Sequence, residues 1–434
     1  MMVRKAWTAA AAVVALGALT LSGCAAGGGG NSGGGGDGEA VELQMWHNST
    51  TGPGKEFWDE AAAAYTEEHP EVTFNVTSIQ NEDMDGKLQT AVNSGDMPDI
   101  FMARGGGKLA DIVAAGKVKD LTDLISDDVK QAFGDASFSA FTVDGKVYGV
   151  PTAVLPGGMF YSKDLFEQAG ITETPTTIDE LGDAVEKLKD AGIQPIALGA
   201  KDAWPAAHWY YFFALRACDQ DTITNLTTQA DFTDECWLQA AEDFQDFAGT
   251  EPFNKGFLTT PAQEGASSSA GLVANHKAAM ELMGAWNVGV IASLTPDEKP
   301  LPDLGWFPFP AVDGGAGDPT AMMGGVDGYA CAADAPAACE DFLNFVSGKE
   351  WQEKYAVAFQ TIPASQEATG AVEDPSLQPL MEAYGDAAYV TLWLDTALGQ
   401  NVGNALNTSV VEMLAGQGSP EKLVDTVSTA AARG

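Results

Sequence analysis

The residues best placed for binding chemistry follow two predicted strands near the start of the folded chain. His47 and Asn48 come directly after a strand that begins at Val41, and Arg104 comes directly after a strand at 99–102. Ligands of open α/β sheets collect beyond the carboxyl ends of strands, so these side chains are candidates for hydrogen bonding to a bound molecule. Arg104 is the strongest candidate, because only 22 of the 434 residues are Lys or Arg and one guanidinium donates several hydrogen bonds. The alternative for Arg104 is a salt bridge to one of the 61 acidic residues.

No catalytic, metal-binding or phosphate-binding pattern accompanies these residues. The four histidines form no ligand cluster, so no metal is predicted; they are His47, His69, His208 and His276. Gly105-Gly106-Gly107 lacks the spacing of a nucleotide-binding loop and predicts a tight turn into a helix at 109–115. Outside the Gly-rich segment that ends at residue 38, the sequence contains neither the Gly-x-Ser-x-Gly elbow of serine hydrolases nor a P-loop. No cofactor is predicted.

The elements that position the polar residues alternate strand and helix. A strand at 41–46 is followed by a helix through Phe57 and Tyr65 that stops at Pro70, a strand at 72–76, a helix around 87–92 and a strand at 99–102. This βαβαβ order predicts a parallel sheet with crossover helices. Thr177 and Glu180 have capping-box spacing before a later helix, and a strand at 196–198 follows it. The predicted fold class is therefore α/β, and the length allows two lobes.

The first residues predict export and a lipid anchor. Arg4 and Lys5 precede an apolar stretch at 6–20 that is too short to span a membrane as a helix. Leu21-Ser22-Gly23-Cys24 resembles the lipobox of bacterial lipoproteins, which implies that residues 1–23 are a signal peptide and that Cys24 carries acyl chains. The Gly-rich residues that follow, up to 38, predict a flexible tether.

Charge and cysteine usage narrow the function classes. The formal net charge of −39 repels phosphate backbones and anionic lipid, which argues against nucleic-acid binding. In an exported chain the four remaining cysteines predict disulfides rather than a metal site. Three pairings are open, and sequence proximity favours Cys218 with Cys236 and Cys331 with Cys339.

From Val41 to near its end the chain resembles the solute-binding proteins of ABC carbohydrate importers, the family that includes maltodextrin binders. The markers are the Trp-ended first strand and, in chain order, Gly95–Ile100, Gly149–Pro151, Tyr161–Phe166, Met283–Trp286 and Gly324–Gly328. The resemblance implies two α/β lobes of the type II periplasmic-binding-protein fold with a hinge and a ligand cleft between them. Residues 39–150 and 320–360 would form the first lobe, and residues 151–319 and 361–434 the second. The first crossing would lie near Val150-Pro151 and the return crossing near 305–310.

A neutral sugar requires aromatic rings against its apolar faces and directed polar groups at its edges. The family's aromatic positions fall on tryptophans at strand ends or in turn-rich segments: Trp46, Trp204, Trp286 and Trp393. The hydroxyl partners chosen are His47, Asn48, Arg104, Asp327 and Asp395, with His208 as either a ligand contact or a core residue. Trp351 and Phe342 are expected to be ordinary core.

The resemblance implies a receptor that captures an oligosaccharide and hands it to a membrane permease with a separate ATPase, working as a lipid-anchored monomer outside the cytoplasm. The first lobe has Trp46-His47-Asn48 in place of the acidic and lysine pair of maltodextrin binders. Maltose is therefore not supported, and the set favours xylo-oligosaccharides, with cello- and chito-oligosaccharides next. Two other classes stay open at this stage, an exported glycoside hydrolase, which needs a carboxyl pair at defined separation, and a receptor for amino acids or peptides.

Overall fold

The first part of the described chain forms a parallel sheet, because short β-branched and aromatic runs alternate with amphipathic helical runs. The computed structural model describes residues 40–50 and 52–433. The elements of this part are β1 (Val41–His47), α1 (Gly52–Glu68), β2 (Val72–Ser78), α2 (Asn81–Ser94), β3 (Ile100–Arg104) and α3 (Gly107–Ala114). β1 pairs in parallel with β2 and with β3, which confirms the predicted βαβαβ unit. The predicted signal peptide, Cys24 and the Gly-rich tether lie outside the described residues.

The three glycines after β3 form the predicted tight turn. Gly106 has a φ of 69°, a value that L side chains rarely adopt. A Cβ at Gly105 would lie 2.6 Å from the Cβ of Ala140, and one at Gly107 would collide with the backbone of Ala397. The glycines therefore allow α3 to start against the C-terminal part of the chain.

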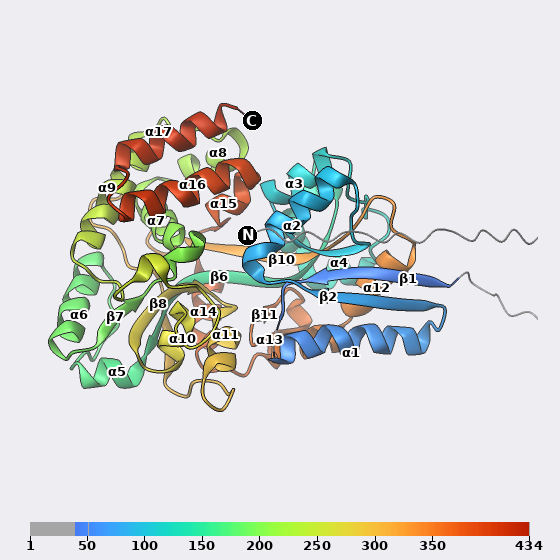
Figure 1. Ribbon diagram of the computed structural model, residues 1–434, viewed down its shortest axis with the longest axis horizontal. Coiled ribbons are helices and arrows are strands. Elements are labelled where there is room, and N and C mark those ends of the chain that lie inside the picture. The colour runs from blue at the N-terminus through green and yellow to red at the C-terminus, as the bar shows by residue number, and fades with distance from the viewer. Residues whose placement is uncertain (1–39, 51, 434) are drawn as a thin grey trace, which may run out of the picture. The chain divides into compact units, whose positions relative to one another are not determined.

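Two long antiparallel strands join the two ends of the main sheet. β6 (Val150–Ser162) and β10 (Met322–Cys331) pair with each other and run side by side through the middle of the folded unit (Figure 1). β10 also pairs with β3, whereas the far end of β6 pairs with β8 (Ala278–Gly284) and β9 (Leu304–Phe307). With β7 (Gln194–Ala197) beside β8, the strand order is β2-β1-β3-β10-β6-β8-β7.

The return crossing is made by β10, so its predicted position at 305–310 is wrong. β9 pairs only with Met159–Ser162 of β6 and so stays with the β8 end of the sheet. Pro308 and Pro310 follow β9 closely, and proline supplies no N–H to continue a ladder. β10 instead pairs with β6 as far as Pro156 and with β3 as far as Ile100, so it connects the two ends of the sheet.

The remaining elements are mostly helices that cover the two ends of this sheet. In chain order they are α4 (Asp127–Ser139), β4 (Thr142–Val143), β5 (Lys146–Val147), α5 (Lys163–Gln168), α6 (Ile178–Asp190), η1 (Ala200–Asp202), α7 (Trp204–Ala217), α8 (Gln220–Gln229), α9 (Glu235–Gly249), η2 (Phe257–Thr259), α10 (Ser269–Ala274), α11 (Asn287–Leu294), α12 (Ala338–Val346), α13 (Lys349–Phe359), β11 (Ile362–Pro363), η3 (Gln366–Ala371), α14 (Leu377–Asp386), β12 (Val390–Leu392), α15 (Leu394–Ala397), α16 (Gly399–Leu414) and α17 (Pro420–Ala431). Within the described residues, no helix combines the length and apolarity needed to cross a bilayer.

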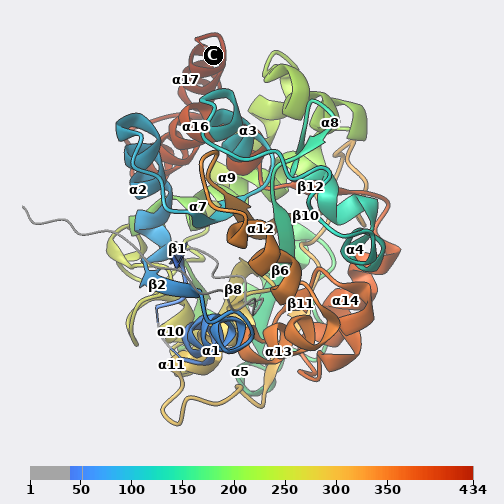
Figure 2. The same ribbon diagram turned by 90° about the vertical axis from the view of Figure 1, so that its right-hand side faces the viewer.

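Separate apolar cores lie at the two ends of the sheet. Trp58, Phe101 and Phe342 belong to a core that includes α1, α12 and α13, and Figure 2 shows α1 beside α13. Trp209 and Leu406 belong to the core of α7, α9, α16 and α17. α7 is apolar on all sides and is buried throughout from Pro205 to Ala217, as expected for an interior helix. Trp351 and Phe342 are buried, which confirms that they are core.

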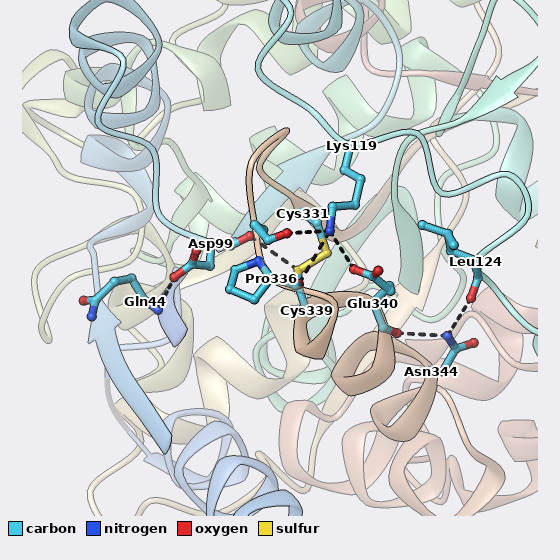
Figure 3. Close-up of a disulfide and its surroundings, with 10 residues drawn as sticks. Gln44, Asp99, Lys119, Leu124, Cys331, Pro336, Cys339, Glu340 and Asn344 are labelled. Atoms are coloured by element: carbon cyan, nitrogen blue, oxygen red, sulfur yellow. Dashed lines mark hydrogen bonds and ion pairs between the residues drawn. A yellow bond between two sulfur atoms is a disulfide. The ribbon is translucent and has the colours of Figure 1, made fainter. Parts of the chain in front are cut away.

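Both disulfides favoured by sequence proximity are present. Cys218–Cys236 ties the end of α7 to the start of α9, and Cys331–Cys339 ties the end of β10 to α12. Figure 3 shows Lys119 reaching the second disulfide loop, where its Nζ donates to the carbonyl of Ala335 at 2.6 Å and to Glu340 Oε2 at 2.9 Å. Disulfides of this kind stabilise by about 2–4 kcal/mol each, so the second one helps to hold the C-terminal end of β10 in place.

Candidate functional site

A cavity of about 990 Å³ lies where α2, β3, α3 and β10 meet α7, α11, α15 and α16. This volume is at the upper end of the range of about 300–1,000 Å³ for small-ligand sites. Eight of the ten predicted site residues line it: Asn48, Arg104, Trp204, His208, Trp286, Asp327, Trp393 and Asp395.

Trp46 and His47 are the two predicted site residues that do not line this cavity. Side chains alternate along a strand, and His47 points to the same buried side of β1 as Leu43 and Met45. His47 Nδ1 accepts a hydrogen bond from the Ser49 amide at 3.2 Å, and the ring is fully buried. Trp46 packs, half-buried, against the core that includes α1.

Four rings form one side of the cavity, named here the aromatic wall: Trp204, His208, Trp286 and Trp393. His208 stacks on Trp393, with ring centroids 4.0 Å apart and planes 8° apart. The ring centroid of Trp286 lies 6.1 Å from that of Trp204 and 6.0 Å from that of Trp393, in both cases with steeply inclined planes. A Cβ at Gly157 or Gly284 would collide with Trp393 or Trp286, so glycine at those positions makes room for the rings.

Four of the five ring nitrogens of the aromatic wall are unsatisfied within the described residues. The indole N–H groups of Trp204, Trp286 and Trp393, and Nδ1 of His208, are buried and have no hydrogen-bond partner among the described residues. Burial lowers the pKa of His208 to about 3, although Asp395 opposes the shift. The wall is therefore uncharged at neutral pH, with donors and an acceptor suited to uncharged polar groups.

Five paired ions form a second part of the lining, named here the charged wall: Asp85, Arg104, Lys108, Asp327 and Asp395. Asp85 of α2 accepts from Arg104 Nε at 3.0 Å and from Lys108 Nζ at 3.0 Å. Lys108 Nζ also donates to Asp395 Oδ2 at 3.2 Å, which links α3 to α15. Asp327 of β10 lies opposite Arg104 of β3 in the sheet, 3.8 Å from its Nη1.

Pairing and burial set the charge states of this wall. Burial raises the pKa of Asp85, but Arg104 and Lys108 outweigh it and hold the pKa well below its usual range. Burial also raises the pKa of Asp395, and Lys108 and His208 again outweigh it, so the net shift is downward. At Asp327 burial prevails over Arg104 and the pKa is raised. Asp327 is therefore the least compensated acid of the charged wall.

Several lining residues were missed in the sequence. Asp85, Lys108 and Asn81 are the main ones, with Asn81 accepting from Arg104 Nη2 at 2.8 Å and from Asn48 at 3.1 Å. Lys108 had a usable signal, because it follows the turn after β3 and basic residues are scarce. Asp85 and Asn81 had none, since polar residues on an amphipathic helix normally face solvent.

Among the described residues, one group could hold a metal ion by its ligand types, namely Asp164, His276 and Asp303. It does not line the cavity. Asp303 already accepts hydrogen bonds from Ser162 Oγ and the Asp164 amide, and its Oδ1 lies 3.0 Å from His276 Nε2. These contacts account for the group without a metal.

Comparisons with known proteins agree on one family. The model of the family described as bacterial extracellular solute-binding protein matches residues 48–353. An ABC transporter extracellular-binding protein of Pyrococcus horikoshii is 26% identical over 345 residues, which cover 78% of this chain and 75% of the relative. A solved structure from work on xylan utilization by Caldanaerobius polysaccharolyticus has a TM-score of 0.82 at 26% identity, covering 90% of this chain and 99% of that one. A chitin oligosaccharide binding protein has a TM-score of 0.80 at 26% identity, with coverages of 91% and 99%.

Proposed function

This chain belongs to the bacterial extracellular solute-binding protein family, and we propose that it captures a short β-linked oligosaccharide, with xylo-oligosaccharides first among the candidates. At the coarser level it is the substrate-binding protein of an ABC sugar importer, with the mixed α/β periplasmic-binding-protein fold. The family consists of binding receptors, so the glycoside hydrolase interpretation is set aside. The two similar structures named for xylan utilization and for chitin oligosaccharides support the β-linked class.

The observation that carries the proposal is the aromatic wall in a cavity that also presents the charged wall. Pyranose rings offer apolar C–H faces to aromatic rings, and their edges carry hydroxyls that need donors and acceptors. The unpartnered N–H groups of Trp204, Trp286 and Trp393 supply donors close to the stacking surfaces. Three inclined indoles suit an extended chain of several sugar units better than a single ring.

The charged wall argues against an amino-acid or peptide ligand. A zwitterion requires a cation that is free to hold its carboxylate, but Arg104 is bound to Asp85 and Asn81. Lys108 is bound to Asp85 and Asp395. With both cations engaged, the wall presents hydrogen-bonding atoms held in fixed positions, which is what neutral hydroxyls require.

The proposal includes the steps around binding. Lining residues come from both proposed lobes, so a bound sugar would favour the closed arrangement of the lobes over the open one. The closed receptor would then present the sugar to the permease subunits, acting as a monomer. Cys24 would carry the lipid anchor that keeps the receptor at the outer face of the cell membrane.

Calorimetric titration of the purified protein tests the proposal. The panel contains xylo-, cello-, chito- and malto-oligosaccharides, and each sugar is recovered afterwards to check that it is intact. We expect micromolar binding, about −8 kcal/mol, for a β-linked class and much weaker binding of maltotriose. Preference for the malto series would contradict the β-linked assignment, and absence of binding across the panel would contradict an oligosaccharide ligand.

A further inference from the structure

The cavity lining is strongly acidic beyond the charged wall. Seven carboxylates line it, against two cations, Arg104 and Lys108. Asp85, Asp327 and Asp395 are the three acids within 4 Å of those cations. The other four are Glu82, Asp202, Glu264 and Glu298, and none of them has an ion pair among the described residues.

Three of these acids that line the cavity are named here the acid row: Glu82 of α2, Asp202 of η1 and Glu264 of the segment before α10. Burial raises the pKa of Glu82, and the charges of Asp202 and Glu264 add to the rise while Arg104 opposes it. Glu82 Oε1 is buried with no hydrogen-bond partner among the described residues. Asp202 has one fixed contact, with the Ala262 amide at 2.7 Å.

The same cavity contains polar side chains that lack partners. His208 and Trp393 are 3% and 5% exposed, and Nδ1 of one and the indole N–H of the other are unsatisfied among the described residues. Both side chains line the cavity. Asp202 of the acid row lies two residues before Trp204 of the aromatic wall, and both line the cavity. The acid row is therefore next to the surface that we assign to sugar binding.

We propose that the acid row gives the cavity a charge preference: it excludes oligosaccharides that carry a uronate and holds the ammonium of an amino sugar. The proposal rests on the proposed function, since it concerns the same cavity. A uronate entering the cavity meets four carboxylates without ion pairs, while both lining cations are already paired. An ammonium meets the opposite field and relieves the repulsion within the row.

Calorimetric titration with matched ligands tests this preference. The first set is xylotriose, the same trisaccharide bearing glucuronic acid, and the neutral amide of that acid, which has nearly the same size. The second set is the glucosamine trimer and the N-acetylglucosamine trimer. At low salt we expect the acid to bind at least about tenfold more weakly than its amide. Within the second set, the glucosamine trimer should bind more tightly than its acetylated counterpart.

Salt and two variants supply the controls. In about 1 M salt, where the Debye length is about 3 Å, the gap between acid and amide should narrow. The double variant Glu82→Gln/Glu264→Gln should narrow the affinity gap between acid and amide at low salt as well. The control is Glu173→Gln, which changes an exposed acid outside the cavity lining and should leave the gap unchanged.

Two outcomes overturn the inference, and they are distinguishable. If the neutral sugars bind but acid and amide bind within about twofold at low salt, the charge preference is wrong and the proposed function stands. If no neutral sugar binds, the proposed function is wrong and the charge preference falls with it.

Discussion

The aromatic wall and the charged wall line the same cavity but are held together by different interactions. Trp393 belongs to an apolar core and Trp286 packs against it. Four ring nitrogens of the aromatic wall have no hydrogen-bond partner in the described part of the chain. Four of the five ions of the charged wall are joined by hydrogen bonds of 3.0 to 3.2 Å, and Asp327 lies 3.8 Å from Arg104 Nη1. We propose from this difference that the rings supply contact area and ligand affinity, while the ions fix the positions of hydrogen-bonding atoms.

The largest expected effect is a loss of protein stability when an ion pair of the charged wall is removed. Asp85→Ala leaves Arg104 and Lys108 without their shared acceptor in a mostly buried place. We expect a loss of about 3 kcal/mol in the free energy of unfolding, measured by urea titration. Asp83→Ala, an exposed acid on the same helix, should cost less than about 1 kcal/mol. Equal losses for the two variants would mean that the pairing does not stabilise the wall.

The next effect concerns affinity at the aromatic wall. Trp204→Ala removes a ring that is only partly buried in the structure and that we assign to sugar stacking. We expect ligand binding to weaken by about 2 kcal/mol, roughly thirtyfold in Kd, as measured by calorimetry. A Kd unchanged in this variant would remove Trp204 from the site.

A smaller effect concerns acid sensitivity. The pKa of His208 is about 3 in the fold, below its ordinary value of 6.5, so between these values the unfolded chain binds a proton that the folded chain does not. Stability from this group is therefore present above pH 6.5 and lost as pH falls, by about 1.4 kcal/mol per pH unit. We therefore expect the free energy of unfolding of His208→Asn to change less with pH than that of the wild type between pH 6 and 4.5. The difference between the two slopes should be about 1.4 kcal/mol per pH unit.

Other groups titrate in the same window, so the comparison between variant and wild type is the informative quantity. His47, with a pKa lowered by burial to about 4, adds a slope of the same sign. Glu281, with a pKa raised by burial to about 7, adds one of opposite sign. Identical slopes for His208→Asn and wild type would show that His208 is protonated within the fold.

The smallest effect is expected at Trp46. It is the last residue but one of β1 and resembles the wall tryptophans in its sequence setting. It packs on the core, however, and does not line the cavity. Trp46→Ala should lower thermal stability and leave the sugar Kd within about twofold. A loss of affinity as large as that of Trp204→Ala would show that Trp46 contributes to sugar binding, and would contradict its assignment to the core.

Trp46 and His47 also show where sequence reasoning stops. The order of strands and helices, the disulfide pairs and the turn at Gly105–Gly107 follow from local patterns, and the structure confirms them. The sequence also predicts the end of the first strand to within one residue, because β1 ends at His47. Which of its side chains face the cavity depends on the packing of α1 against β1, and no local pattern reports that contact.

The charged wall was only partly predictable for a related reason. Arg104, Asp327 and Asp395 follow from scarce charge at strand ends and from the family resemblance. Asp85 and Lys108 join them because α2 and α3 bring their polar sides to the same place as β10 and α15. Lys108 and Asp395 are 287 positions apart in the chain, and a contact at that separation is set by the fold as a whole.

A crystal structure of the protein with its tightest-binding neutral oligosaccharide tests the central claim most directly. The account predicts sugar rings against Trp204, Trp286 and Trp393, with hydroxyls hydrogen-bonded to Asp327 and other atoms of the charged wall. A sugar bound elsewhere on the protein, or in the cavity without contact to the three tryptophans, would contradict it.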